Sequence, residues 1–184
     1  MIKNLKSSLI LTVILILMFG VVYPLGIYTI GLVFSSNSVG SPIVKNEQIV
    51  GFENIGQSFT DDKYFWGRPS TVGYNAASTG GSNKGPTNPD YLAEVQARID
   101  TFLLHNPGVK KEEIPSDLVT APGSGIDPNI SPNSAYIQVK RIAVVRNLPE
   151  AQIKALVDQS IENTVLGMPV INVLKLNLKL DELK

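Results

Sequence analysis

The sequence predicts an α+β domain with a small sheet and about three helices, preceded by one N-terminal transmembrane helix. Three observations lead to this fold class: a long uncharged apolar stretch near the N-terminus, three segments with helical spacing and recognisable starts, and short segments with strand patterns. The length of 184 residues fits one domain with an accessory segment. Charged residues make up 17% of the chain, below the roughly 25% of a typical soluble domain, and the apolar stretch accounts for this deficit.

The composition excludes several classes of site. Lys and Arg together number 16, as do Asp and Glu, so the net charge is zero and general electrostatic attraction to nucleic acid is not expected. The absence of cysteine excludes disulfides, zinc–thiolate sites, iron–sulfur clusters and thiol catalysis. His105 is the single histidine, which excludes a histidine-rich metal site within one chain. We therefore expect neither a metal site nor catalytic residues.

The apolar stretch is long enough to cross a bilayer. No Asp, Glu, Lys or Arg occurs from Ser7 to Val44, and the densest part, Leu9 to Phe34, has 26 residues. A hydrocarbon core about 30 Å thick needs about 20 helical residues. Because proline removes a backbone hydrogen bond, we expect a kink near Tyr23-Pro24, close to Gly20.

A cleaved secretory signal is the alternative for this stretch. Lys3 and Lys6 would be its basic head, and residues 35–38 a region of small side chains suited to cleavage. However, the apolar core of such a signal has about 7–15 residues, and this one is much longer. We therefore expect a retained anchor.

The two lysines also predict the orientation. Because positive residues flanking a span remain in the cytoplasm, we expect a cytoplasmic segment at residues 1–8, a transmembrane helix at 9–34 and an extracytoplasmic α+β domain at 35–184. The expected location is the inner (plasma) membrane, crossed once. The exported part is slightly acidic, with a net charge of −2.

The first half of the exported part is rich in glycine and proline. Residues 35–89 predict mostly turns and short strands, such as Gln48–Phe52. The first helix then begins with Asn88 as its cap and Pro89 in its first turn, and it ends by Asn106-Pro107. Its apolar positions at helical spacing are Leu92, Val95, Ile99, Phe102 and Leu103.

Two more helices and one strand follow. The helices begin at Ser131-Pro132 and at Leu148-Pro149-Glu150. The C-terminal leucines of residues 174–180 alternate with polar residues, which is typical of a half-buried strand. The residues expected on buried faces are Ala135, Val139, Ile142 and Ala143 in the second helix, Ile153, Leu156, Val157 and Ile161 in the third, and Leu174, Leu176, Leu178 and Leu180 in the strand.

The segment from Gly67 to Pro89 combines five glycines with Ser, Thr, Asn and the cations Arg68 and Lys84. One interpretation is an anion or nucleotide cradle, because glycine lets backbone N–H groups approach phosphate closely. The phosphate-loop spacing is absent, since Lys84 is followed by Gly85. Spacing alone therefore favours the other interpretation, an ordered loop whose Asn and Ser side chains satisfy their own backbone.

The remaining polar residues predict structural roles. Asp117 and Asp127 lie in a turn-rich stretch, and Asp127 before Pro128 favours a turn rather than acid–base catalysis. We expect His105 to interact with the helix dipole or solvent. The cations of the second helix predict a solvated basic face. They are Lys140, Arg141 and Arg146.

The order of short motifs resembles the C subunit of the Kdp potassium-transporting ATPase, over nearly the whole chain. A Tyr-Pro-bearing N-terminal helix comes first. The motifs that follow it are IGQSF (Ile55–Phe59), YFWGRPS (Tyr64–Ser70), YNAASTGGSN (Tyr74–Asn83), GPTNP (Gly85–Pro89), SDLVT (Ser116–Thr120), GSGIDPNISP (Gly123–Pro132) and INVLKLNL (Ile171–Leu178).

The resemblance implies a non-catalytic subunit of a bacterial or archaeal membrane complex. Its partners would be a channel-like potassium-binding subunit, a P-type ATPase subunit and a very small accessory subunit. The family is described as assisting assembly and as raising the affinity of the ATPase subunit for ATP. This chain lacks the Asp-Lys-Thr-Gly-Thr phosphorylation sequence of P-type ATPases. We therefore expect the complex to handle ATP and potassium, and this chain alone to bind no cofactor.

From these motifs we select residues for nucleotide or partner contact and for the membrane anchor. The contact residues are Gln57, Arg68, Asn75, Gly80, Gly81, Ser82, Asn83, Lys84, Asp127 and Arg141, and the anchor residues are Gly20, Tyr23 and Pro24.

The predicted orientation bears on the role. ATP hydrolysis is cytoplasmic, whereas Lys3 and Lys6 place the domain outside. We therefore favour a helix packed against the channel-like or ATPase subunit, with the domain over the extracellular ion entrance, where it stabilises the assembly and shapes potassium access. The alternative is an independent membrane-anchored nucleotide-binding protein or enzyme that uses the Gly67–Pro89 loop.

Overall fold

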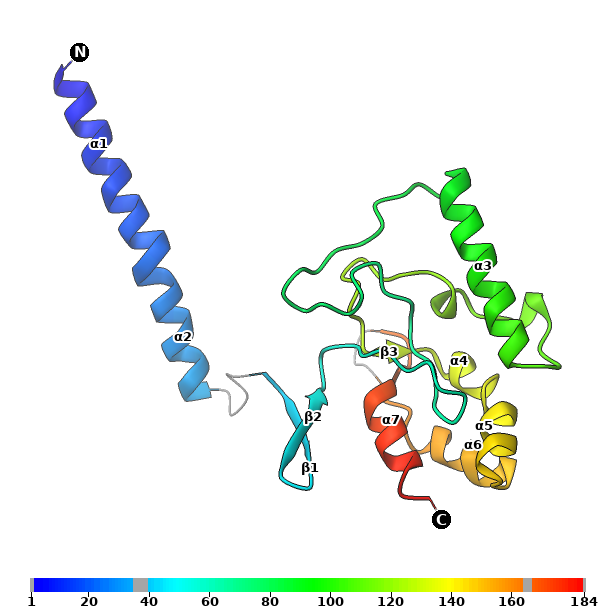
Figure 1. The fold of residues 1–184 in the computed structure, drawn as a ribbon. Helices are drawn as coiled ribbons and strands as arrows, with labels where there is room; N and C mark the ends of the chain where they lie inside the picture. Colours follow the sequence, from blue (N-terminus) through cyan, green and yellow to red (C-terminus); the bar gives the residue numbers. More distant parts are fainter. Residues whose placement is uncertain (1, 35–39, 164–166, 184) are drawn as a thin grey trace. The chain divides into compact units, whose positions relative to one another are not determined.

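A computed structural model describes residues 2–34, 40–163 and 167–183 in two compact units, Met1–Ser41 and Pro42–Lys184. The region suggested above for signal cleavage, residues 35–38, lies outside the described residues. The helices and strands are shown in Figure 1. The first unit contains α1 (Ile2–Leu17), a π-helix (Met18–Val22) and α2 (Tyr23–Phe34), and the second contains β1 (Pro42–Lys45), β2 (Gln48–Phe52), α3 (Pro89–His105), two 3-10 turns (Lys111–Glu113 and Ser116–Leu118), β3 (Asn129–Ile130), α4 (Pro132–Tyr136), α5 (Val139–Arg146), α6 (Glu150–Asp158), β4 (Ile171–Asn172) and α7 (Val173–Leu180).

The first unit is one continuous helical rod. Its stretch Asn4–Val33 has 30 residues, and the mean hydropathy within an 18-residue window of it is 2.6, so it is long and apolar enough to cross a membrane. The π-helix interrupts the α-helical spacing directly before Tyr23-Pro24, where the sequence predicts a kink.

The second unit confirms the α+β class and contains two small antiparallel sheets, β1–β2 and β3–β4. β2 coincides with the strand predicted at Gln48–Phe52. Asn46 and Glu47, which join it to β1, both have the positive φ that a two-residue type I′ turn requires. The shorter sheet pairs Ile130 with Ile171, both buried, and brings the middle of the domain to the C-terminal segment.

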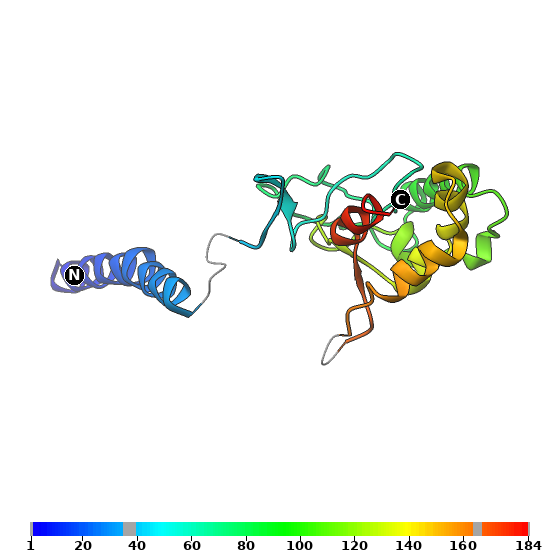
Figure 2. The same ribbon diagram turned by 90° about the horizontal axis from the view of Figure 1, so that it is seen from below.

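The predicted helix starts are confirmed. Asn88 caps α3, with its side chain accepting a hydrogen bond from the Tyr91 N–H. Ser131 caps α4 in the same way, and Pro149 precedes α6. The helix predicted from Ser131 is two helices, α4 and α5, with a break at Ile137-Gln138. In both views α5 and α6 lie side by side (Figures 1 and 2).

The prediction of a C-terminal strand was wrong, because residues 173–180 form α7. Asn172 caps this helix by accepting a hydrogen bond from the Lys175 N–H at 3.1 Å. Leu and Lys are strong helix formers, and burial at Val173, Leu176 and Leu180 follows the helical spacing of three and four residues. A leucine at every even position fits the two-residue alternation of a strand, and some of these leucines also fit the helical spacing of three and four residues. The alternation alone therefore does not distinguish a strand from a helix here.

The core is formed by the helices of the second unit and by one irregular segment that contains Phe65, which is fully buried. The backbone of this segment is bonded by side chains rather than by a strand. Asn177 of α7 accepts from the Phe65 N–H at 2.9 Å and donates to the Phe65 carbonyl at 3.0 Å. Gln138 accepts from the Trp66 N–H at 2.8 Å and donates to the Trp66 carbonyl at 3.2 Å.

We expect Asn177→Leu to lower the free energy of unfolding by about 2–4 kcal/mol, because two buried backbone groups of Phe65 lose their partners. Urea unfolding of the full chain in detergent, followed by fluorescence of the single tryptophan, measures this change. Lys179→Ala on the exposed side of α7 is the control and should change the value by less than about 0.5 kcal/mol. Equal effects of the two substitutions would contradict the role given to Asn177.

Candidate functional site

The loop from Gly67 to Pro89 is held by its own side chains. The Ser70 hydroxyl accepts from the N–H groups of Val72 and Tyr74 and donates to the Gly125 carbonyl at 2.6 Å. The Asn75 side chain accepts from the Ala77 N–H at 3.0 Å. This arrangement is the one expected of an ordered loop that satisfies its own backbone.

The glycines of this loop bring its backbone against a second loop. The Gly80 N–H donates to the Ser124 carbonyl at 2.9 Å. A Cβ atom on Gly81 would lie 3.2 Å from the Gly123 carbonyl oxygen, and one on Gly125 would lie 2.7 Å from the Gly80 carbonyl oxygen. The glycines therefore allow two loop backbones to pack together, and the Gly80 N–H already has an acceptor.

Both cations of the loop have carboxylate partners. Arg68 Nη1 lies 3.0 Å from Asp127 Oδ2, and Lys84 pairs with Glu94 of α3. The hydrogen bond from Lys84 lowers the pKa of the Glu94 carboxyl. Each positive charge is thus offset locally, which weakens the field that a phosphate group would require.

The structure brings together three of the predicted contact residues. Gln57, Arg68 and Asp127 border a cavity of about 10 Å³, a volume suited to a single water molecule and too small for a nucleotide. Arg68 and Asp127 also border two open surface depressions of about 550 Å³ each. This ion pair therefore lies at a surface that a macromolecule can reach.

The other contact residues of the loop line none of these three cavities. Asn75, Asn83 and Lys84 are exposed, and Asn83 has a positive φ of 53°. The Ser82 hydroxyl accepts from the Lys84 N–H at 3.5 Å.

Both aspartates of the segment 115–132 hold backbone. The Asp127 carboxylate accepts from the Asn129 N–H at 3.0 Å, which confirms the predicted turn role. The Asp117 carboxylate accepts from the Ser131 N–H at 2.7 Å and from the Ser134 hydroxyl at 2.6 Å, at the start of α4.

The prediction of a solvated basic face on the second helix was wrong for Arg141, which is buried. Its guanidinium lies 4.8 Å from the Trp66 ring centroid. It donates to the Asn106 side chain at 3.0 Å, the Asp62 carbonyl at 2.6 Å and the Gln138 side chain at 2.6 Å. Burial lowers the pKa of Arg141 to about 10, against the opposing effect of Asp62, so it remains a cation at neutral pH.

Arg146 also turns inward, since its guanidinium lies 2.7 Å from an Asp181 carboxylate oxygen and donates to the Lys63 carbonyl. Lys140 is the exposed member of the predicted basic face.

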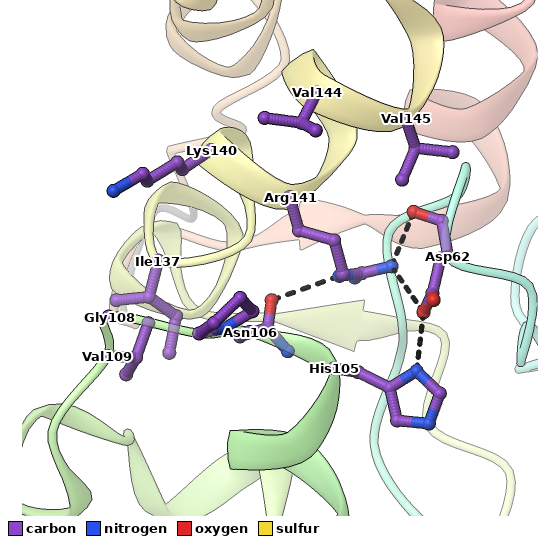
Figure 3. Close-up of a pocket in the computed structure, with 11 residues that line it drawn as sticks. Asp62, His105, Asn106, Gly108, Val109, Ile137, Lys140, Arg141, Val144 and Val145 are labelled. Atoms are coloured by element: carbon purple, nitrogen blue, oxygen red, sulfur yellow. Dashed lines mark hydrogen bonds and ion pairs between the residues drawn. The ribbon is translucent and has the colours of Figure 1, made fainter.

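Sequence reasoning missed a pocket of about 220 Å³ at the surface of α5. One of its walls is polar: His105 Nδ1 lies 2.8 Å from Asp62 Oδ1, and the same oxygen lies 3.6 Å from Arg141 Nη1 (Figure 3). The other lining side chains include Ile137, Val144 and Val145. The three polar residues are far apart in the sequence. The one signal in the sequence that could have indicated this pocket was the pair Val144-Val145, apolar residues on the same helix as Lys140.

His105 is the last residue of α3, where a helix-dipole role was expected, and its ring contacts the Asp62 carboxylate and the Trp66 ring. Among the residues that the structure describes, no three His, Cys, Asp or Glu side chains are grouped as a metal site requires.

The anchor residues lie at the π-helix of the first unit. The Tyr23 N–H donates to the Met18 carbonyl, five residues back. Pro24 has no N–H, so it donates to no carbonyl. Gly20 has no atom within 4 Å of the position that a Cβ would take, which leaves the backbone beside it open.

Comparison with known proteins gives the same family over nearly the whole chain. The family model for KdpC, described as the K⁺-transporting ATPase c chain, matches residues 5–182. Two relatives called potassium-transporting ATPase KdpC subunit, from Flavobacterium psychrophilum and Flavobacterium johnsoniae, are each 56% identical, with 99% of this chain and 100% of each relative covered. One from Bacteroides thetaiotaomicron is 50% identical over the same shares of both chains.

We expect Gly125→Ala to lower the free energy of unfolding by about 2–4 kcal/mol, because it adds a Cβ at a φ of 71° and against the Gly80 carbonyl. Gly85→Ala is a matched control in the same pair of loops, since its Cβ meets nothing within 4 Å, and it should be neutral within about 0.5 kcal/mol. Urea unfolding measures both. Equal stability of the two variants would show that the loops do not depend on this close approach.

Proposed function

The chain belongs to the KdpC family, the c chain of the K⁺-transporting ATPase, and we propose that it is the accessory subunit that holds this complex together at the outer side of the membrane. In this proposal the chain is not itself an enzyme. Its partners are the channel-like potassium-binding subunit, the P-type ATPase subunit and the small accessory subunit, and the complex handles ATP and potassium. The observation that carries the proposal is the family match over residues 5–182, which includes both the apolar helix and the second unit.

The N-terminal helix supports membrane anchoring. Its 30-residue apolar stretch, Asn4–Val33, exceeds the roughly 20 residues needed to cross a hydrocarbon core. Lys6 lies at its N-terminal end, as does Lys3 in the sequence, and positive charge favours the cytoplasmic side. We therefore propose a single span in the inner (plasma) membrane with an extracytoplasmic C-terminal unit.

The π-helix supports a contact between this helix and another membrane helix. In a continuous helix the Phe19 carbonyl would accept from Tyr23 or, in π geometry, from residue 24. Tyr23 uses its N–H for Met18, and Pro24 has none. A backbone carbonyl without a donor is costly in lipid. A hydroxyl or amide side chain from a neighbouring helix can donate to it, and Gly20, which has no side chain, lets such a helix approach closely.

The proposed extracytoplasmic placement favours one of the two effects proposed for the subunit. An outer domain does not meet cytoplasmic ATP, so we propose that any effect on ATP affinity passes through the partner subunits. The pairing of Arg68 with Asp127 and of Lys84 with Glu94 favours this view over nucleotide binding by the Gly67–Pro89 loop. We propose instead that the domain lies over the outer ion entrance and shapes potassium access.

The chain has no cysteine, so single-cysteine labelling can test the orientation. We expect a membrane-impermeant maleimide to label Ser78→Cys, an exposed loop position, in intact spheroplasts. Asn4→Cys at the other end of the helix should be labelled only after permeabilisation. The reverse pattern would overturn the proposed orientation and return direct ATP contact to consideration.

We expect Gly20→Leu to reduce the amount of the larger subunits retained with this chain by roughly threefold to tenfold, because a leucine at this position keeps a neighbouring helix from approaching closely. Blue-native electrophoresis of the solubilised complex measures retention. Val13→Leu, on the same helix away from the π-helix, is the control and should retain the subunits fully.

Removal of residues 1–36 should abolish assembly, and unchanged assembly after that deletion would contradict the anchoring role.

A further inference from the structure

The pocket beside α5 has the features of a docking site for one side chain. Its volume of about 220 Å³ is below the roughly 300–1,000 Å³ of pockets that hold whole small-molecule ligands. Ile137 and Val109 line it, together with Val144 and Val145. A cavity of this size and lining suits an aliphatic side chain rather than a nucleotide or a cofactor.

The lip of the pocket is unusually apolar for a helix surface. Val144 is 73% exposed and Val145 is 51% exposed, although both belong to α5, whose other face packs in the core. Removing a valine side chain from water is favourable, and exposed apolar residues around a cavity mark sites where another molecule packs. Val144 lies one helical turn after Lys140, so the cation and the valine share one face of the helix.

The charges at the pocket favour an acidic partner. Lys140 is exposed, its Nζ lies near Gly108 at the rim, and it makes no ion pair with any described residue. On the opposite side of the view in Figure 3, Asp62 is held by His105 and Arg141, so its charge is offset within the wall. The pocket therefore presents one unpaired positive charge beside an apolar cavity.

The polar wall is fixed before any partner arrives. Arg141 is bonded to Asn106, Gln138 and the Asp62 backbone, and Asn106 donates to the Phe102 carbonyl at 2.8 Å. These bonds tie the end of α3 to α5, which keeps the two walls of the pocket in place. A preformed pocket binds with less loss of conformational entropy than one that must be ordered.

We propose that this pocket receives an aliphatic side chain that another subunit of the complex presents next to a carboxylate. The aliphatic group enters between Val144 and Ile137, and the carboxylate pairs with Lys140. This inference rests on the proposed function, because the occupant comes from an extracytoplasmic loop of one of the larger subunits. The pocket then serves as a fixed point of contact between the domain and the complex.

The test uses the full chain in the assembled complex, with the photoreactive amino acid p-benzoylphenylalanine replacing Val144. Irradiation should give a crosslink to one of the two larger subunits, and mass spectrometry should place it within two residues of an Asp or Glu and next to an aliphatic residue. The same replacement at Ala93, on the exposed side of α3, is the control and should give no such product.

A second set of variants tests the charge. Lys140→Glu should lower the yield of the Val144 crosslink by roughly fivefold, whereas Lys140→Arg should keep it. Lys154→Glu on α6 makes the same charge change at another exposed position and should have no effect. An unchanged unfolding midpoint, followed by Trp66 fluorescence, should accompany all three variants.

The outcomes separate this inference from the proposed function. An intact complex without a Val144 crosslink overturns the inference and leaves the proposed function standing. A product formed with a second copy of this chain or with lipid also overturns it, as does equal yield for Lys140→Glu and Lys140→Arg. Failure of the unmodified chain to copurify with the larger subunits contradicts the proposed function, and the inference falls with it.

Discussion

The backbone of Phe65 and Trp66 crosses the core outside any strand, and two buried amide side chains take the place of neighbouring strands. Asn177 bonds both backbone groups of Phe65, and Gln138 bonds both of Trp66. Buried N–H and C=O groups without partners would be costly, so the irregular segment can enter the core only because these amides meet it. The position of α5 and α7 therefore depends on this pairing.

The same network continues to the surface and forms the pocket. Gln138 accepts from Arg141, which also bonds Asn106 at the end of α3. One connected set of buried polar groups thus joins α3, α5 and α7. Because these groups are hydrogen-bonded to one another, a shift of one helix disturbs the hydrogen bonds of the other two. The polar wall of the pocket is therefore held as firmly as the core.

The loop at residues 67–89 and the segment at residues 115–132 are held in place by different interactions from those of the core. They contain few buried apolar side chains and are ordered by close backbone contact at glycines and by Ser, Asn and Asp side chains. This leaves their outer surfaces free of a packing role. In a subunit of a membrane complex, a domain with such ordered loops offers contact surfaces that do not have to fold on binding.

The sequence by itself determined what depends on local spacing. The apolar rod, the start of α3 at Asn88, the starts of α4 and α6 and the strand Gln48–Phe52 follow from hydropathy, capping residues and proline positions, and the motif order indicated the family. Tertiary structure alone decided the outcome where the local sequence allowed two alternatives, such as a strand or a helix, or an exposed or a buried side chain. Residues 173–180 form a helix in which Asn177 bonds the backbone of Phe65, a residue distant in the chain. Arg141 is buried because Asp62 and Asn106, both distant in the chain, meet its guanidinium together with the neighbouring Gln138. No local pattern records partners more than thirty residues away, because such contacts exist only once the chain has folded.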